Sequence, residues 1–309
     1  MHDRIAHTAE HAFIGALQRI LGETLRVRKV EHGDSGNTAF IVIPQLRIDD
    51  VIKAESEVNS LIAEGRKVSE RTFESLEEAK NQIQNLRANK ERISGKVRVV
   101  EIENHDAAAC AMEHADNLSE CEFFLVTRVS KTGSEYEVDF AVSRPAKEIA
   151  VFLSATLLRV CSELGANINT VENTAMRIKA EHESSIAKLR ALSREKLEDI
   201  KPENFGHLTL FKGVFSSLLD DQILEFAGRK IASKGTAVIV GNVGPEIATV
   251  VFARNENMSK IDCNALFRKF ASDTGRGGGR SHFVTGVVKS ASARGVIEGI
   301  SDEITSKKF

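Results

Sequence analysis

The 309-residue sequence has only four cysteines and four prolines, and it contains no long apolar run. The cysteines at positions 110, 121, 161 and 263 never pair at short spacing, so a disulfide scaffold is not expected in a chain of this length. No stretch approaches the roughly 18 consecutive apolar residues of a membrane span. The first thirteen residues hold two acidic side chains and no continuous apolar stretch, so we expect no signal peptide, no membrane contact and a cytoplasmic protein.

Charge is nearly balanced, with a formal net charge of -2, but it is unevenly spread. Residues 204–309 carry 14 Lys and Arg against 10 Asp and Glu. This mild excess allows a nucleic-acid contact in the last third without the strongly basic character of a dedicated binding domain. The length, about twice that of a common domain, predicts two or three structural units.

Helical and strand-like patterns alternate along the chain and predict an α+β protein in three parts. Residues 1–145 are expected to form a mixed α/β domain, and residues 146–203, which have no proline before Pro202, a helical connector that is either a helical hairpin or a short coiled coil. Residues 204–309 are expected to form a compact α/β domain with a glycine-rich loop. The elements predicted for the first part are helices over 3–22, 49–63 and 75–90, strands over 25–30, 38–43, 67–73 and 96–102, and a hairpin over 122–142.

Two pairs of metal-ligating residues share the same spacing. His7 and His11 lie four apart on the first predicted helix, so both imidazoles project from one face. Cys110 and His114 repeat that spacing and add the thiolate and third imidazole that a tetrahedral zinc site prefers. The four residues therefore predict one Zn²⁺ site. In the alternative interpretation, Cys110 is a small buried hydrophobe in an alanine-rich segment and His114 faces water.

Both pairs carry a resemblance to a known family. The segment HTAEHAFIGALQRILG resembles the first zinc half-motif of the editing domains of alanyl- and threonyl-tRNA synthetases and of the freestanding alanyl-tRNA editing proteins. The segment CAMEHADNLSECEFFLVTRV keeps Cys110, His114, Asn117 and Glu120 in the order of the second half-motif, CGGTH and its flank. The resemblance implies a zinc-dependent hydrolase that removes a wrong amino acid, serine or glycine, from alanine tRNA.

The interior of the second half-motif departs from that family. Ala111, Met112 and Glu113 stand where the family has two glycines and a threonine, which changes the backbone freedom and the room near the metal. The replacements are also compatible with a helix. The second ligand pair is therefore expected either on a helix or on a turn.

Four residues near the ligands are candidates for further roles. Glu10 and Glu113 each lie between two ligands and are either acid/base or ligand-orienting groups, or carboxylates on a solvated helix face. His105, five residues before Cys110, is a further catalytic or orienting candidate. Thr8 either contacts a hydroxylated amino acid or packs and caps its own helix.

The segment GRGGGRSHFVTG, residues 275–286, is the other candidate binding element. Its expected nucleic-acid-binding residues offer backbone N–H groups and positive charge to phosphates; they are Arg276, Gly277, Gly278, Gly279 and Arg280. The alternative is a flexible loop. Together with the helical connector, the segment resembles the C-terminal domain that alanyl-tRNA synthetases share with DHH-family phosphoesterases, although no DHH catalytic motif is present.

This second resemblance implies tRNA as the partner and a possible homodimer. Two alternative functions remain open at this point. One is a non-catalytic RNA-binding or assembly protein that keeps zinc as a structural element, and the other is a hydrolase of a different ester or amide on the same zinc scaffold.

Overall fold

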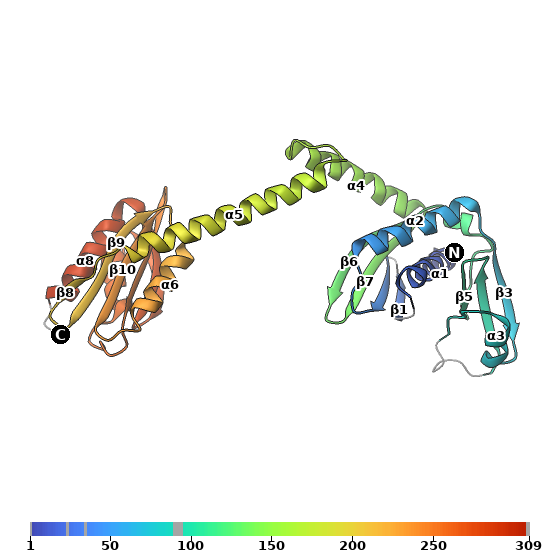
Figure 1. Cartoon of the computed structure of the whole chain (residues 1–309), viewed down its shortest axis with the longest axis horizontal. Helices are drawn as coiled ribbons and strands as arrows, with labels where there is room; N and C mark the ends of the chain where they lie inside the picture. Colours follow the sequence, from blue (N-terminus) through green and yellow to red (C-terminus); the bar gives the residue numbers. More distant parts are fainter. Residues whose placement is uncertain (1, 23–24, 34–35, 89–94, 307–309) are drawn as a thin grey trace. The chain divides into compact units, whose positions relative to one another are not determined.

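A computed structural model of the chain describes residues 2–22, 25–33, 36–88 and 95–306 (Figure 1). The chain divides into two compact units, Met1–Val171 and Glu172–Phe309. Both units combine helices with β-sheets, so the predicted mixed α+β class is confirmed. The division into three parts at residues 145 and 203 stays a prediction. Among the described residues, no helix has both the length and the apolar composition that crossing a membrane requires.

Helix α1 (His2–Leu21) lies at the centre of the first unit, between its two sheets and against helix α2 (Ile48–Glu64) (Figure 1). Every residue from Ala6 to Leu17 is buried. A helix that is buried on all faces normally carries apolar residues on all of them, and α1 follows this rule except at a few polar positions. Those polar side chains therefore need partners inside the unit.

A four-stranded antiparallel sheet, in the order β1-β2-β7-β6, packs against one side of α1. Aromatic rings join the two, because Phe13 of α1 lies 5.1 Å from Phe124 and Phe124 lies 5.3 Å from Phe140, centroid to centroid. Gly133 forms the tip of the predicted hairpin with a φ of 63°. The strands are β1 (Arg26–Gly33), β2 (Gly36–Val42), β6 (Phe124–Thr132) and β7 (Glu135–Val142).

A smaller antiparallel sheet, β3-β4-β5, lies on the other side of α1 and carries helix α3 (Leu76–Gln82). Ser75 caps α3, but the helix ends at Gln82 rather than near residue 90, because Ile83 is extended and Asn85 has a φ of 58°. Residues 89–94 of that predicted helix lie outside the described part. The strands are β3 (Val68–Phe73), β4 (Val97–Ile102) and β5 (Asp106–Ala109).

The predicted connector is helical. Helix α4 (Ser143–Glu163) belongs to the first unit, and helix α5 (Val171–Glu198) belongs almost entirely to the second. In the first unit, the short helix η2 (Leu118–Cys121) precedes β6.

The second unit is a six-stranded sheet covered by helices on both faces. Alternate residues of β10 serve two separate cores: Ile239 packs with helices α7 (Cys263–Ala271) and α8 (Ala293–Ser306), and Val240 with α6 (Asp220–Lys230). Strands β9 and β10 pair in parallel, and the other neighbouring strands of this sheet pair antiparallel. In the spatial order β12-β13-β11-β10-β9-β8, the strands are Gly275–Arg280, Phe283–Lys289, Ile247–Arg254, Thr236–Val243, Leu208–Ser216 and Glu203–Phe205.

The glycine-rich segment is not the predicted loop but the edge strand β12, paired with β13. The ring of Phe267 in α7 explains two of its glycines. A Cβ atom at Gly277 would lie 2.6 Å from that ring, and one at Gly286 would lie 2.4 Å from it. The glycines thus let the ring pack directly on the backbone, a tertiary requirement that composition alone did not reveal.

Candidate metal centre

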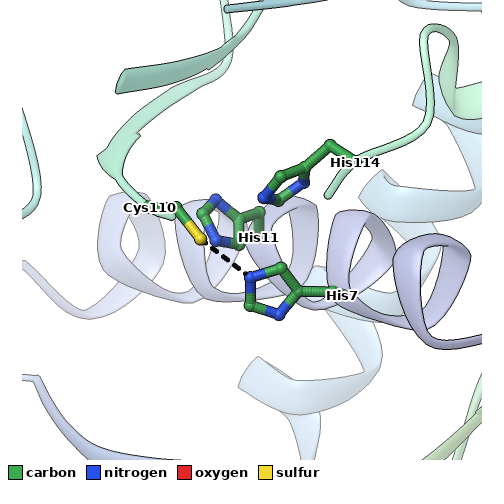
Figure 2. Close-up of side chains that lie close together, drawn as sticks. All are labelled: His7, His11, Cys110 and His114. Atoms are coloured by element: carbon green, nitrogen blue, oxygen red, sulfur yellow. Dashed lines mark hydrogen bonds between the residues drawn. The ribbon is translucent and has the colours of Figure 1, made fainter. Parts of the chain in front are cut away.

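Four side chains from two parts of the first unit point toward one another (Figure 2). His7 and His11 come from α1, whereas Cys110 directly follows β5 and His114 lies in the irregular segment after it. The candidate ligand atoms all lie within 4.8 Å of one another. The sequence-predicted ligand set is therefore assembled in space, and His7 Nε2 lies 3.0 Å from Cys110 Sγ.

The segment that carries Cys110 and His114 is irregular chain, so the helical alternative for it is wrong. Three hydrogen bonds fix its path. The Cys110 N–H donates to Arg98 O at 3.0 Å, and the Arg98 guanidinium donates to Ala111 O at 3.0 Å. At the far end, Arg4 donates to His114 O at 3.3 Å.

Asn117 and Glu120, the two positions kept from the family pattern, hold the end of this segment. They form a reciprocal capping box at the start of η2. Glu120 also accepts a 2.6 Å bond from Arg4. Both residues therefore act on the backbone next to His114 rather than in the cluster itself.

The hydroxyl of Thr8 determines which nitrogen of His114 faces the cluster. It donates its hydrogen to Arg4 O at 2.7 Å and accepts from the Ala115 N–H at 2.9 Å. Its remaining lone pair lies 3.1 Å from His114 Nδ1, which must therefore be the protonated donor. The Nε2 lone pair of His114 is then free, and this buried atom has no hydrogen-bond partner among the described residues.

A chain of hydrogen bonds from the four-stranded sheet sets His7 in the same way. The Asn37 amide nitrogen donates to Phe140 O at 3.2 Å, so its oxygen accepts from His32 Nδ1 at 2.9 Å. His32 Nε2 is then an acceptor, 3.2 Å from His7 Nδ1. His7 consequently carries its proton on Nδ1 and turns the Nε2 lone pair toward Cys110. His32 has no ligand at motif spacing, and for that reason sequence reasoning set it aside.

His11 lies beside a buried ion pair. Its Nδ1 atom is buried without a hydrogen-bond partner in the described part of the chain and lies 3.8 Å from an Asp106 oxygen. Arg87 binds the Asp106 carboxylate, with a 2.8 Å bond from Nε, and its NH2 group lies 3.5 Å from His11 O. Neither residue was singled out from the sequence, since nothing in their spacing links them to α1.

Burial keeps the three imidazoles of the cluster neutral. Desolvation, followed by nearby positive charge, lowers the pKa of His7 to about 3 and that of His114 to about 4, and it holds the pKa of His11 well below its usual value. Burial also raises the pKa of the Cys110 thiol. Neutral imidazoles have lone pairs available for a cation at pH 7.

The cluster could hold a metal ion. Three nitrogens and one sulfur suit tetrahedral zinc, and the two buried, unpartnered ring nitrogens are costly unless a cation or a donor satisfies them. Neighbouring ligand atoms around zinc lie about 3.4 Å apart at the usual bond lengths. Small side-chain rotations would therefore close the set around one ion.

The other candidate residues lie around the cluster, not in it. Glu10 is buried, with Oε2 3.3 Å from His7 Nδ1, and burial raises its pKa to about 7. Glu113 is exposed. His105 uses both ring nitrogens elsewhere: Nε2 donates to Ala12 O at 2.7 Å, and Nδ1 accepts from Arg19 at 2.7 Å.

Replacing Thr8 by valine should weaken metal binding by about 10- to 100-fold, because the His114 ring and the Ala115 N–H lose the oxygen that orients them. Competition with a chromophoric chelator measures the affinity. Thr156→Val is the matched control, since Thr156 donates in the same way to the carbonyl four residues earlier, but in α4. Equal affinity in the two variants would contradict the orienting role of Thr8.

Comparisons with known proteins relate the chain to alanine–tRNA ligases. No protein-family model matches the sequence. The chain is 23% identical over 92% of its length to the alanine–tRNA ligases of Ignicoccus hospitalis and of Malacoplasma penetrans, covering 31% and 34% of those proteins. It is also 28% identical over 46% of its length to the Thermoplasma acidophilum alanine–tRNA ligase, covering 16% of it. The chain is therefore related to alanine–tRNA ligases and spans at most about a third of the length of these relatives.

Two solved structures are also similar. One is the C-Ala domain from Aquifex aeolicus alanyl-tRNA synthetase, 22% identical, with 33% of this chain matched to 99% of that one at a TM-score of 0.29. The other is a DHH domain from a protein described as a member of a family of ribosomal proteins, 13% identical, with 45% of this chain matched to 35% of that one at a TM-score of 0.31. Both TM-scores are too low to support an argument about the fold.

Proposed function

We propose that the chain is a zinc-dependent hydrolase that releases a wrongly attached amino acid, serine or glycine, from alanine tRNA in the cytoplasm. The observation that carries this proposal is the buried cluster of His7, His11, Cys110 and His114 in a chain related to alanine–tRNA ligases. A zinc ion there would polarise the ester carbonyl or lower the pKa of a bound water toward about 7, provided that one coordination position stays open.

The ligands of this chain differ in how firmly they are held. His7 and His114 have their outer nitrogens engaged by His32 and Thr8, which presets their free lone pairs. Cys110 is only half-buried and follows the end of β5. We infer that three protein ligands bind tightly and that the fourth position is exchangeable; a metal-bound structure with a closed four-ligand tetrahedron would contradict direct activation of water.

A polar cleft of about 890 Å³ supports an extended polar substrate. Gly15, one turn beyond His11, lines the cleft together with Gln18 and Gly22, whereas none of the four ligands is among its lining residues. These positions lie on the same side of α1 as the two histidine ligands. Several side-chain amides and three arginines line the cleft, and these groups suit a nucleotide chain such as the end of a tRNA.

The edge strand β12 offers a second nucleic-acid contact in the other unit. Arg276, Gly278 and Arg280 share one face of the strand, because alternate residues point the same way. A Cβ atom at Gly278 would meet nothing within 4 Å, so this face is open. We propose that Arg276 and Arg280 bind tRNA phosphates on either side of Gly278, which has no side chain to block the approach. Gly277 and Gly279 face the opposite side of the strand.

The non-catalytic alternative rests on Ala111, Met112 and Glu113, which replace the family residues between the last two ligands. A deacylation assay with mischarged alanine and threonine tRNAs separates the possibilities. Zinc-dependent release of serine or glycine supports editing, and tight tRNA binding without turnover supports an RNA-binding or assembly protein. Turnover of small esters with no action on aminoacyl-tRNA supports a hydrolase of another class.

A homodimer is the further partner that we propose, and helix α4 supplies its surface. Its apolar side chains are exposed on most sides, at 71% for Val151, 64% for Phe152 and 55% for Leu158. Such a helix normally packs against another element. Its charges are also self-complementary: in an antiparallel pair of α4 helices centred after residue 153, Arg144 faces Glu163, and Glu148 faces Arg159. A helix about 31 Å long supplies a large part of the roughly 800 Å² per partner of a stable interface.

Replacing Leu158 by lysine should convert a dimer to monomers at micromolar concentration, because a charge would be buried in the paired helices. Analytical ultracentrifugation of the full chain measures this change. Ile48→Lys is the control, since Ile48 is an exposed apolar side chain of a different helix, α2, at 57%. A wild-type chain that is monomeric at all concentrations would contradict the α4 interface.

A further inference from the structure

The outer nitrogen of His7 faces two groups that are not part of the cluster described above. His32 Nε2 lies 3.2 Å from His7 Nδ1, and Glu10 Oε2 lies 3.3 Å from the same atom. Glu10 is only 4% exposed, and His32 is half-buried at the edge of the site. The Nδ1 atom of His7, the imidazole of His32 and the buried carboxyl group of Glu10 therefore lie close together.

These three groups are poorly matched as hydrogen-bond partners. The bond from His32 to Asn37 makes His32 Nε2 an acceptor, and the ionised form of the Glu10 carboxyl group accepts as well. His7 Nδ1–H can supply only one proton between them. The charged Arg87 side chain is engaged with Asp106 rather than with Glu10. A buried carboxylate in this position is favourable when a cation is bound beside it.

We propose that a second divalent transition-metal ion binds between Nδ1 of His7, the Glu10 carboxylate and Nε2 of His32, so that the His7 ring bridges two ions. The inference rests on the proposed metal centre at Cys110, because that centre takes the other nitrogen of the same ring. Two imidazoles and one carboxylate form a common donor set for first-row transition metals. The donor separations of 3.2 and 3.3 Å match the spacing of about 3.4 Å around such an ion.

The double site carries a net charge of +1 once its protons have been released. On binding the first ion, the Cys110 thiol loses its proton to solvent. On binding the second ion, His7 loses its Nδ1 proton to solvent and becomes an imidazolate, and any proton on the Glu10 carboxyl group is released as well. The Cys110 thiolate, the Glu10 carboxylate and this imidazolate together carry three negative charges against four positive charges of two divalent ions. Because His32 is half-buried, the second ion can enter from solvent without opening the core.

Cobalt titration of the full chain tests the proposal, because Co²⁺ bound to Cys110 shows a thiolate-to-cobalt absorption that the second ion lacks. We expect two Co²⁺ per chain, of which only one contributes to the thiolate band. Glu10→Gln and His32→Gln should each bind one Co²⁺ and retain the thiolate band. Two variants are needed because Glu10 is buried, and circular dichroism checks that both fold.

The controls are Glu31→Gln, an exposed carboxylate on the strand of His32, and His182→Gln on α5; both should bind two ions. One ion per chain with the thiolate band would overturn the second site and leave the centre at Cys110 intact. If the wild-type chain instead bound one Co²⁺ without the thiolate band, and Glu10→Gln did not bind it, the centre at Cys110 and the shared His7 ring would be contradicted.

Discussion

Replacing His11 by alanine should reduce the release of serine from mischarged alanine tRNA by at least about 100-fold. The centroid of the His11 ring lies 4.8 Å from that of the His7 ring and 4.6 Å from that of the His114 ring. Its loss removes one of four donors, and a metal that supplies several kcal/mol of transition-state stabilisation is lost or misplaced. Each 1.4 kcal/mol corresponds to a factor of about ten in rate. Single-turnover deacylation, with zinc content measured on the same sample, gives the result.

His182→Ala is the matched control for that experiment. His182 lies on the exposed side of α5 in the second unit, so its replacement should change neither zinc content nor rate. If His11→Ala lost its zinc but kept the wild-type rate, zinc would be structural, and the editing mechanism would be wrong.

Replacing Arg87 by methionine should lower the free energy of unfolding of the first unit by about 3 kcal/mol or more. The Asp106 side chain is only 5% exposed, and that of Arg87 is 18% exposed. Removal of one partner leaves an uncompensated buried charge, which is the costly way to break an ion pair. Methionine has a similar length and no charge, so the volume is largely kept. Asp106 also lies near His11, so the variant should bind metal more weakly.

Urea unfolding followed by tyrosine fluorescence measures this effect in the full chain. The chain has one tyrosine and no tryptophan, and Tyr136 is a buried residue of β7 in the first unit. The signal therefore reports that unit alone. Arg71→Met is the control, because the Arg71–Glu101 pair is more exposed and should contribute less than about 1 kcal/mol. Equal losses in the two variants would contradict a special role for the buried pair.

Local patterns predicted the elements that have strong periodicity or turn chemistry. The helical repeat of the first segment gave α1, and Gly133 marked the hairpin tip. The equal spacing of His7–His11 and Cys110–His114 identified the cluster because two pairs of ligands on different elements rarely match by accident. Local sequence was sufficient for these features.

Pairing between distant segments produced the features that the sequence did not predict. Ala107–Ala109 form strand β5 because Val99–Glu101 of β4 offer hydrogen-bond partners, and this overrides the helical preference of alanine. Gly277 lies in a strand because it pairs with Gly286 of β13, and the ring of Phe267 leaves no room for a Cβ atom there. Apart from Thr8, the groups that orient the ligands come from elements other than α1. No spacing rule connects His32 or Asp106 with that helix.

Zinc analysis of the purified full chain, beside Cys110→Ala, tests the central claim most directly. X-ray absorption at the zinc edge should show one sulfur at about 2.3 Å and nitrogens at about 2.0 Å. Cys110→Ala should lose the sulfur signal and bind zinc more weakly, because three imidazoles remain. A wild-type chain without zinc, or an unchanged zinc content and absorption edge in Cys110→Ala, would contradict the metal centre and the hydrolase built on it.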